Sequence, residues 1–245
     1  MVKKKVKERI LEDTKKRIKN TKKKIEDARK KINSLEYDAH WYRRAFHAFG
    51  ASFLFYYILP DEEWINVLKF WVPPIIVVIA ILLEVLRLKG FVSSDHFFGL
   101  RMYEKNRVGS YVFFAVAILL LLRFFPQPIA IPCILCACLG DPFIGEIRHR
   151  FGMPYVYVMG FLICMIFFLV SWYKADPLLM ILVGIVGAFG AIIGETKKFW
   201  WLDDDFMIQI LPALLVGIIW IALPYLGYGD PGSALDVINP GIWPW

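Results

Sequence analysis

The feature that most constrains the fold is a series of apolar runs, each close to the length that a helix needs to cross a lipid bilayer. Crossing takes about 20 predominantly apolar residues, because the hydrocarbon layer is about 30 Å thick. The chain has 245 residues and is 58% hydrophobic, whereas soluble domains are closer to half apolar. Inside lipid every main-chain polar group needs an internal partner, and helical bundles satisfy this requirement. The runs therefore predict an all-α, polytopic transmembrane bundle.

Seven spans are predicted from these runs. The second contains Pro73 and Pro74, which predicts either a kinked helix or an interfacial segment that leads into a helix. The fourth is short and contains Pro132, so a broken or re-entrant segment is an alternative to a full crossing. The expected spans are about Ala45–Leu59, Trp64–Leu88, Gly109–Phe125, Pro126–Leu139, Pro154–Tyr173, Pro177–Gly194 and Phe206–Leu223.

The positions of Lys and Arg predict how this bundle is oriented. If all seven spans cross and the N-terminus is cytosolic, the extracytosolic segments hold only Arg123 and Lys174. Basic residues concentrate in cytosolic connections of membrane proteins, and the arrangement satisfies that rule. We therefore expect an integral, multi-pass protein with a cytosolic N-terminus and an extracytosolic C-terminus.

Two segments flank the expected transmembrane domain, which covers residues 41–225. Residues 1–40 are rich in Lys and Glu, and apolar residues recur every seven positions at Leu11, Ile18, Ile25 and Ile32. A solvated amphipathic helix, a coiled coil that joins a homodimer, and a helix lying on anionic lipid all fit this pattern. Residues 226–245 form a tail rich in Gly, Pro and Trp, expected outside the cytosol.

Composition limits the partners and the cysteine chemistry. The net charge of +7 is concentrated in the first 31 residues, where contact with membrane lipids explains it without a nucleic-acid partner. The four cysteines all lie inside apolar runs, so we interpret them as packing residues rather than metal ligands or a disulfide framework. They are Cys133, Cys136, Cys138 and Cys164.

Asp141 is the strongest functional candidate, because a carboxylate at the mouth of a membrane helix is costly. It lies in Gly140-Asp141-Pro142, directly after the fourth apolar run. In the predicted topology the charged residues near the other helix ends share its face. Carboxylates there can hold Mg²⁺, whereas Arg and Lys can neutralise phosphate. Ordinary roles stay open for some of them: Glu84 and Arg87 can form an ion pair, and Asp203–Asp205 can cap a helix.

Four stretches, in order, carry a resemblance to a known family. They are Arg43-Arg44-Ala45-Phe46-His47, then Arg101-x-x-Glu104 with Gly109-Ser110, then Gly140-Asp141-Pro142 with Gly145 and Phe151-Gly152, and finally Glu195 with Asp204-Asp205-Phe206. The chain resembles the polyprenol kinase family, which includes dolichol kinase and the CTP-dependent diacylglycerol and phytol kinases. That family is related in fold to the CDP-lipid synthases.

The resemblance implies a kinase that uses CTP and Mg²⁺ to phosphorylate a membrane lipid alcohol at the cytosolic face. Asp141, Glu195 and Asp205 are the expected metal ligands. Besides Asp141, the expected catalytic residues are His47 and Glu104, either of which would take the proton of the lipid hydroxyl. The expected nucleotide- and phosphate-binding residues are Arg43, Arg44, Arg101, Lys105, Gly140, Gly145, Arg148 and Lys197.

Two other functions fit the same charges. A cytidylyltransferase that forms a CDP-lipid is the first, and a non-enzymatic transporter or scaffold is the second. The chain lacks a Walker-type phosphate loop, which excludes a P-loop enzyme. It also lacks the Lys-Ser-x-Glu-Gly element that the resembled family has after its Gly-Asp signature, and it carries Glu146 where the family commonly has a basic residue.

Overall fold

The computed structural model describes residues 22, 44–93, 100, 104, 106–197 and 202–226. Every regular element in these ranges is helical, which confirms the all-α prediction for the described part of the chain. The predicted N-terminal helix, apart from Lys22, and the tail after Leu226 lie outside the described residues, so their predicted roles stay untested.

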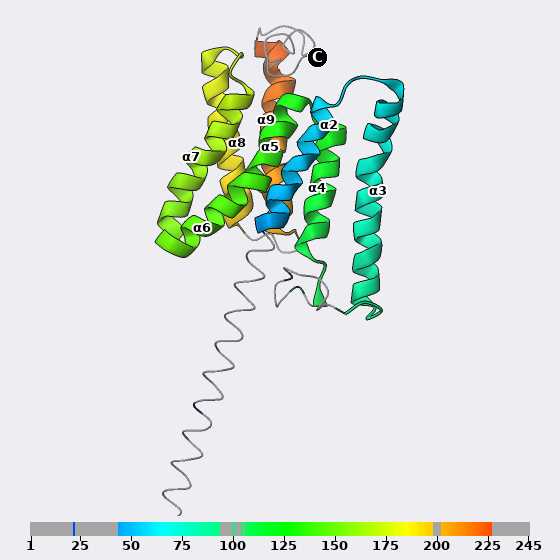
Figure 1. Cartoon of the computed structure of the whole chain (residues 1–245). Coiled ribbons are helices and arrows are strands. Elements are labelled where there is room, and N and C mark those ends of the chain that lie inside the picture. Colours follow the sequence, from blue (N-terminus) through cyan, green and yellow to red (C-terminus); the bar gives the residue numbers. More distant parts are fainter. Residues whose placement is uncertain are drawn as a thin grey trace, which may run out of the picture.

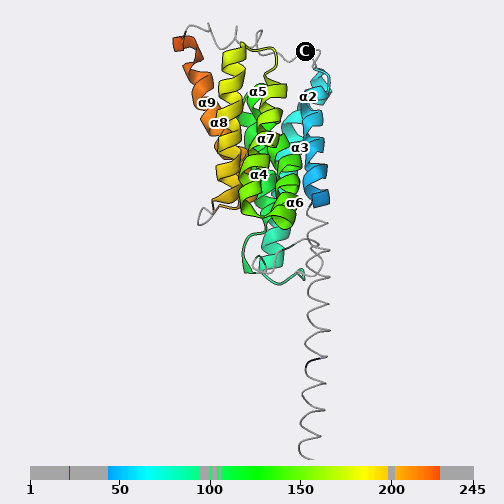
Figure 2. The same ribbon diagram turned by 90° about the vertical axis from the view of Figure 1, so that its left-hand side faces the viewer.

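The helices form an up-and-down bundle (Figures 1 and 2). Residues 44–58 make the first pass, in which helical residues 44–50 lead through η1 (Ala51–Leu54) into α2 (Phe55–Ile58). The following elements are α3 (Glu63–Leu88), α4 (Ser110–Phe124), α5 (Gln127–Leu135), η4 (Cys136–Gly140), α6 (Asp141–Phe151), α7 (Met153–Ser171), α8 (Pro177–Thr196), α9 (Asp204–Ala222) and η5 (Leu223–Leu226).

Five helical stretches are long and apolar enough to cross a membrane: Glu63–Leu88, Gln127–Phe151, Met153–Ser171, Pro177–Thr196 and Asp204–Tyr225. They support a membrane protein of several spans. The first pass is interrupted by a 3₁₀ turn, and α4 has 15 residues, fewer than the roughly 20 that a crossing helix needs. The count of seven spans and the orientation therefore stay predictions.

The sequence predicted that the fourth helix ends at Leu139. In the structure the helix continues beyond that residue. It continues from Gln127 to Phe151, because the π-helical turn η4 joins α5 directly to α6. Pro132 lies within α5 and does not break it. Residues 141–151 are thus a helix rather than a loop, and Figure 1 shows α6 running obliquely from α5 toward the base of α7. Likewise, α3 continues through Pro73 and Pro74 as one helix.

Glycines bring α8 against its neighbours. A side-chain carbon at Gly190 would lie 2.8 Å from Cα of Pro212 on α9, and one at Gly194 would overlap the carbonyl of Met207. One at Gly187 would lie 2.5 Å from the ring of Phe168 on α7. Small residues allow this close packing of membrane helices, and here it holds the start of α9 beside the end of α8.

We expect Gly194→Ala to destabilise the protein by about 1–3 kcal/mol, because the added methyl group meets rigid main chain. Gly184→Ala is the matched control, since its methyl group would lie 3.1 Å from the flexible side chain of Leu169. Thermal unfolding in detergent measures both. Equal stability of the two variants would contradict the close approach of α8 and α9.

Candidate functional site

One end of the bundle collects the charged side chains. The start of the first helix, the end of α3, the start of α4, α6, the end of α8 and the start of α9 all lie there (Figure 1). Among the residues that the structure describes, the buried charged side chains and the buried histidine lie in these segments or, for Glu104, in the connection that leads into α4. They are His47, Glu84, Arg87, Glu104, Glu195 and Asp205. The predicted shared face is therefore present, and whether it faces the cytosol stays a prediction.

His47 lies between two carboxylates at this end. Its Nδ1 is 3.4 Å from Oδ2 of Asp141, and its Nε2 is 3.6 Å from Oδ2 of Asp205. The side chains of His47 and Asp205 are 2% and 0% exposed, and that of Asp141 is 15% exposed. The imidazole also packs against the ring of Phe114, with centroids 4.9 Å apart. Three helices that are distant in the sequence thus supply one buried cluster, which we call the His47 cluster.

A main-chain carbonyl fixes the tautomer of His47. Nδ1 lies 3.1 Å from the carbonyl oxygen of Ala137. A carbonyl oxygen only accepts hydrogen bonds, so Nδ1 carries a proton and donates it to this contact. In the neutral ring Nε2 then keeps its lone pair, and this is the nitrogen that faces Asp205.

The π-helical turn explains why that carbonyl is available. Within η4 the N–H of Asp141 donates to the carbonyl of Cys136, five residues back. The carbonyl of Ala137 would accept from residue 141 in α-helical register or from residue 142 in π-helical register. Residue 142 is proline, which has no N–H. His47 takes the place of the missing helical donor.

The His47 cluster can approach a single metal ion. His47, Asp141 and Asp205 each offer one ligand atom, and these atoms lie within 4.8 Å of one another. Two carboxylates suit Mg²⁺, with water and phosphate oxygens completing the octahedron, and a nitrogen donor also suits Mn²⁺ or Zn²⁺. The residues therefore fit a divalent cation. The run Asp203–Asp205 forms a second group of the same size, and Glu195, also expected to bind metal, belongs to neither.

Three ion pairs lie around α6, next to the cluster. Arg148 donates to Oε1 of Glu195 at 2.6 Å, which places Glu195 against an arginine rather than against His47. Arg44 contacts Glu146 at 2.7 Å, and Arg150 also donates to Glu146. Two of the expected phosphate-binding residues, Arg44 on the first helix and Arg148 on α6, are thus each held by a carboxylate.

Glu84 and Arg87 form a separate buried cluster that holds the connection between α3 and α4. Arg87 donates to Glu84 through Nε at 2.7 Å and through an NH2 group at 2.6 Å. Glu84 also accepts from the main chain of Gly109 at 2.6 Å and from the hydroxyl of Tyr111 at 2.7 Å. Arg87 reaches the carbonyl oxygens of Glu104 and Arg107 at 3.2 and 2.6 Å. The ion pair is therefore a structural clamp.

The remaining expected residues divide into three groups. Glu104 is buried, and its main-chain carbonyl accepts from Arg87 and from the N–H of Arg107. Its role as a base stays a prediction. Gly140 ends the π-helical turn and Gly145 lies in α6; neither has a positive φ, so both glycines that were expected to bind phosphate are helical residues. A side-chain carbon at Gly145 would meet no atom within 4 Å. Arg43, Arg101 and Lys105 lie outside the described residues.

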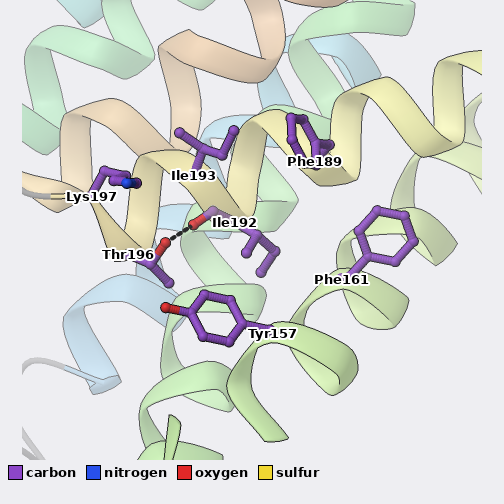
Figure 3. A pocket seen from close by; sticks show the side chains of 7 residues that line it. All are labelled: Tyr157, Phe161, Phe189, Ile192, Ile193, Thr196 and Lys197. Carbon is purple, nitrogen blue, oxygen red and sulfur yellow. Dashed lines mark hydrogen bonds between the residues drawn. The ribbon is translucent and has the colours of Figure 1, made fainter. Parts of the chain in front are cut away.

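A groove of about 430 Å³ runs between α7 and α8 near the charged end of the bundle (Figure 3). Its apolar wall includes Phe161, Phe189 and Ile193, and Lys197 and Thr196 lie together at one end. The full lining is Tyr157, Phe161, Phe189, Ile192, Ile193, Thr196 and Lys197. Lys197, which was expected to bind phosphate, thus lies at the end of this groove, and no sequence pattern predicted the groove.

No protein-family model matches the chain, and no curated protein or solved structure is significantly similar to it. The resemblance to polyprenol kinases therefore stays a prediction from the four sequence stretches.

Two parts of the site had no counterpart in the sequence analysis. One is the π-helical turn that turns the carbonyl of Ala137 toward His47, and the other is the packing of Phe114 on the imidazole. Pro142 was the available signal, because a proline directly after Asp141 removes a helical donor at a known position.

Removing the cation of the structural clamp tests its role. We expect Arg87→Met to destabilise the protein by about 3–5 kcal/mol, because the carboxylate of Glu84 stays buried without its charged partner. Thermal unfolding in detergent measures the loss. The double variant Glu84→Gln with Arg87→Met is the control, and we expect it to recover part of the stability. A single variant as stable as the wild type would contradict the clamp.

Proposed function

We propose that the chain is a CTP-dependent kinase that transfers a phosphoryl group to the hydroxyl of a membrane lipid alcohol, at the end of the bundle where the charges gather. The observation that carries this proposal is the His47 cluster. His47, Asp141 and Asp205 come from three of the four stretches on which the family resemblance rests, and they meet in one buried group.

The residues around α6 supply what phosphoryl transfer requires. The protein's part in this reaction is mainly to position the reactants and to offset negative charge. Asp141 and Asp205 would hold Mg²⁺, which when bound neutralises charge on the nucleotide phosphates. Arg44 and Arg148 are paired with Glu146 and Glu195, and each could exchange its carboxylate partner for a phosphate of the nucleotide.

His47 has an environment that differs from that of an open general base. It is 2% exposed, its Nδ1 donates to Ala137, and its Nε2 faces Asp205. A loose phosphoryl-transfer transition state asks little of a base. We therefore place His47 beside the metal ion rather than beside the lipid hydroxyl. The lipid hydroxyl then loses its proton to solvent or to phosphate.

The groove between α7 and α8 supports a lipid acceptor. Its wall is apolar and aromatic, and its end at Thr196 and Lys197 directly follows Glu195 in the chain. A hydrocarbon chain along the groove would bring a hydroxyl head group to the charged end of the bundle. Its volume lies within the range of about 300–1,000 Å³ that is usual for small-molecule sites.

The distribution of charge favours this function over transport. A transporter needs polar groups along a path through the membrane. In the described part of the chain the buried charged groups lie at one end, and the other buried side chains are overwhelmingly apolar. A site that serves one membrane face fits this distribution better than a path across it.

Isotope transfer is the experiment that tests the proposed function. Purified protein in mixed micelles of a polyprenol or a diacylglycerol should transfer label from the γ-phosphate of CTP to the lipid. Transfer from the α-phosphate would indicate a cytidylyltransferase instead. If neither label moves with several lipid alcohols, whether Mg²⁺ or Mn²⁺ is supplied, the proposed kinase function is wrong.

Asp141→Asn tests the metal-binding carboxylate within that assay. The substitution keeps the size of the side chain but removes its charge, so we expect the rate of transfer to fall about a thousandfold or more. Folding should be unchanged, as judged by thermal unfolding. A folded variant that keeps more than about a tenth of the wild-type rate at saturating Mg²⁺ would contradict the assignment.

A larger side chain in the groove should weaken binding of the lipid alcohol without changing binding of CTP. We expect Ile193→Trp to raise the KM for the lipid alcohol about tenfold, because a lost apolar contact of about 1.4 kcal/mol corresponds to that factor, and to leave the KM for CTP unchanged. Ile185→Trp, on an exposed part of the same helix, is the matched control. Equal lipid KM values for the two variants would count against the groove.

A further inference from the structure

We propose that His47 is itself a metal ligand, through Nε2, and that the ion it shares with Asp141 and Asp205 is one that accepts an imidazole nitrogen, such as Mn²⁺ or Zn²⁺. This deepens the proposed function, on which it rests for the role of the ion in phosphoryl transfer. Binding of the ion can be measured without any catalysis, so the two can fail separately.

The separation of the two side chains is that of ligands to one ion. Nε2 of His47 lies 3.6 Å from Oδ2 of Asp205, which is longer than the usual hydrogen bond of about 2.7–3.2 Å. Two atoms that each lie about 2.1 Å from one ion can be up to about 4.2 Å apart. Asp141 is the third member: its Oδ2 lies 3.4 Å from Nδ1, and one ligand atom from each of the three residues lies within 4.8 Å of the others. To share an ion held by Nε2, the carboxylate of Asp141 would turn toward that nitrogen.

The other ring nitrogen has the contact that metal-binding histidines usually make. Such histidines donate their second N–H to a carboxylate or to a main-chain carbonyl, which fixes the tautomer and the direction of the ring. His47 makes this contact with Ala137 at 3.1 Å. The consequence is that the unprotonated nitrogen of a neutral ring is directed to the carboxylate of Asp205.

Pro142 and the π-helical turn make that contact available. Because Asp141 donates to Cys136 and Pro142 has no N–H, no main-chain donor in helical register competes with His47 for Ala137. We therefore assign Pro142 as a positioning residue. π-Helical turns inside α-helices are often found at functional sites, and this one precedes a member of the cluster by a single position.

The charges of the cluster also call for a cation. Two carboxylates approach the same imidazole within 3.4 and 3.6 Å, and Asp205 is fully buried. Buried charges are commonly paired or bound to metal. A divalent ion with one nitrogen and two oxygen donors from the protein satisfies this condition, and the donor set suits Mn²⁺ or Zn²⁺ better than Ca²⁺.

The experiment measures binding of Mn²⁺ to the purified, metal-free chain without nucleotide, by electron paramagnetic resonance. In the wild type we expect one tightly bound ion whose electron spin-echo modulation shows a coordinated imidazole nitrogen. In His47→Gln we expect Mn²⁺ affinity to fall at least about tenfold and the nitrogen signal to vanish, while Mg²⁺ affinity changes less, because an amide oxygen replaces the nitrogen.

Pro142→Ala tests the positioning role with every metal ligand intact. The new N–H can donate to Ala137 and compete with His47, so we expect Mn²⁺ affinity to fall about 10–100-fold, with unchanged thermal unfolding. Asp203→Asn is the control for the neighbouring acidic run, and we expect it to change Mn²⁺ affinity less than about threefold.

Three results would overturn the inference. In the first, the wild type binds Mn²⁺ without a nitrogen signal and His47→Gln binds it equally well, which would mean that only the carboxylates coordinate the ion. Loss of binding in Asp203→Asn but not in His47→Gln would move the ion to the acidic run. No binding of Mn²⁺ or Zn²⁺ by the wild type would remove the site. A nitrogen-coordinated ion in a protein that transfers no phosphate would contradict the proposed function alone.

Discussion

The organisation of the site depends on a main-chain carbonyl, that of Ala137, and on which group donates to it. In a membrane helix an unpaired carbonyl costs several kcal/mol, because lipid offers no hydrogen-bond donor. A proline at residue 142 would ordinarily create that cost. The π-helical turn and the imidazole of His47 remove it together. The hydrogen bond from His47 to Ala137, at the π-helical turn before Asp141, thereby joins the first helix to the fourth.

The same need for partners explains why the buried charged groups of the described residues lie at one end of the bundle. Arg87 and Glu84 satisfy each other and hold the main chain that leads into α4. Glu195 is held by Arg148, and the glycines of α8 bring α9 close enough to add Asp205 to the cluster. The hydrophobic core of the described residues packs the helices together.

Much of the fold followed from the sequence, because apolar length and period mark membrane helices directly. The sixth span, expected over Pro177–Gly194, is α8, and Glu84 with Arg87 pair as their spacing allowed. The fourth helix was predicted too short, because Gly140 and Pro142 usually end a helix. Here a π-helical turn continues it, and the distant His47 donates to the carbonyl of Ala137. Glu195 was predicted to join Asp141, but its partner depends on how α6 lies against α8, which no local pattern specifies. The groove between α7 and α8 likewise depends on packing alone.

The measurement that tests the account most directly is anomalous X-ray scattering from crystals of the protein grown with Mn²⁺. The account predicts one strong anomalous peak at the charged end of the bundle, about 2.0–2.3 Å from Nε2 of His47 and from carboxylate oxygens of Asp141 and Asp205. His47 should still donate to Ala137 across an intact π-helical turn. A peak confined to Asp203 and Asp204, or an α-helix without the π-helical turn before Asp141, would contradict it.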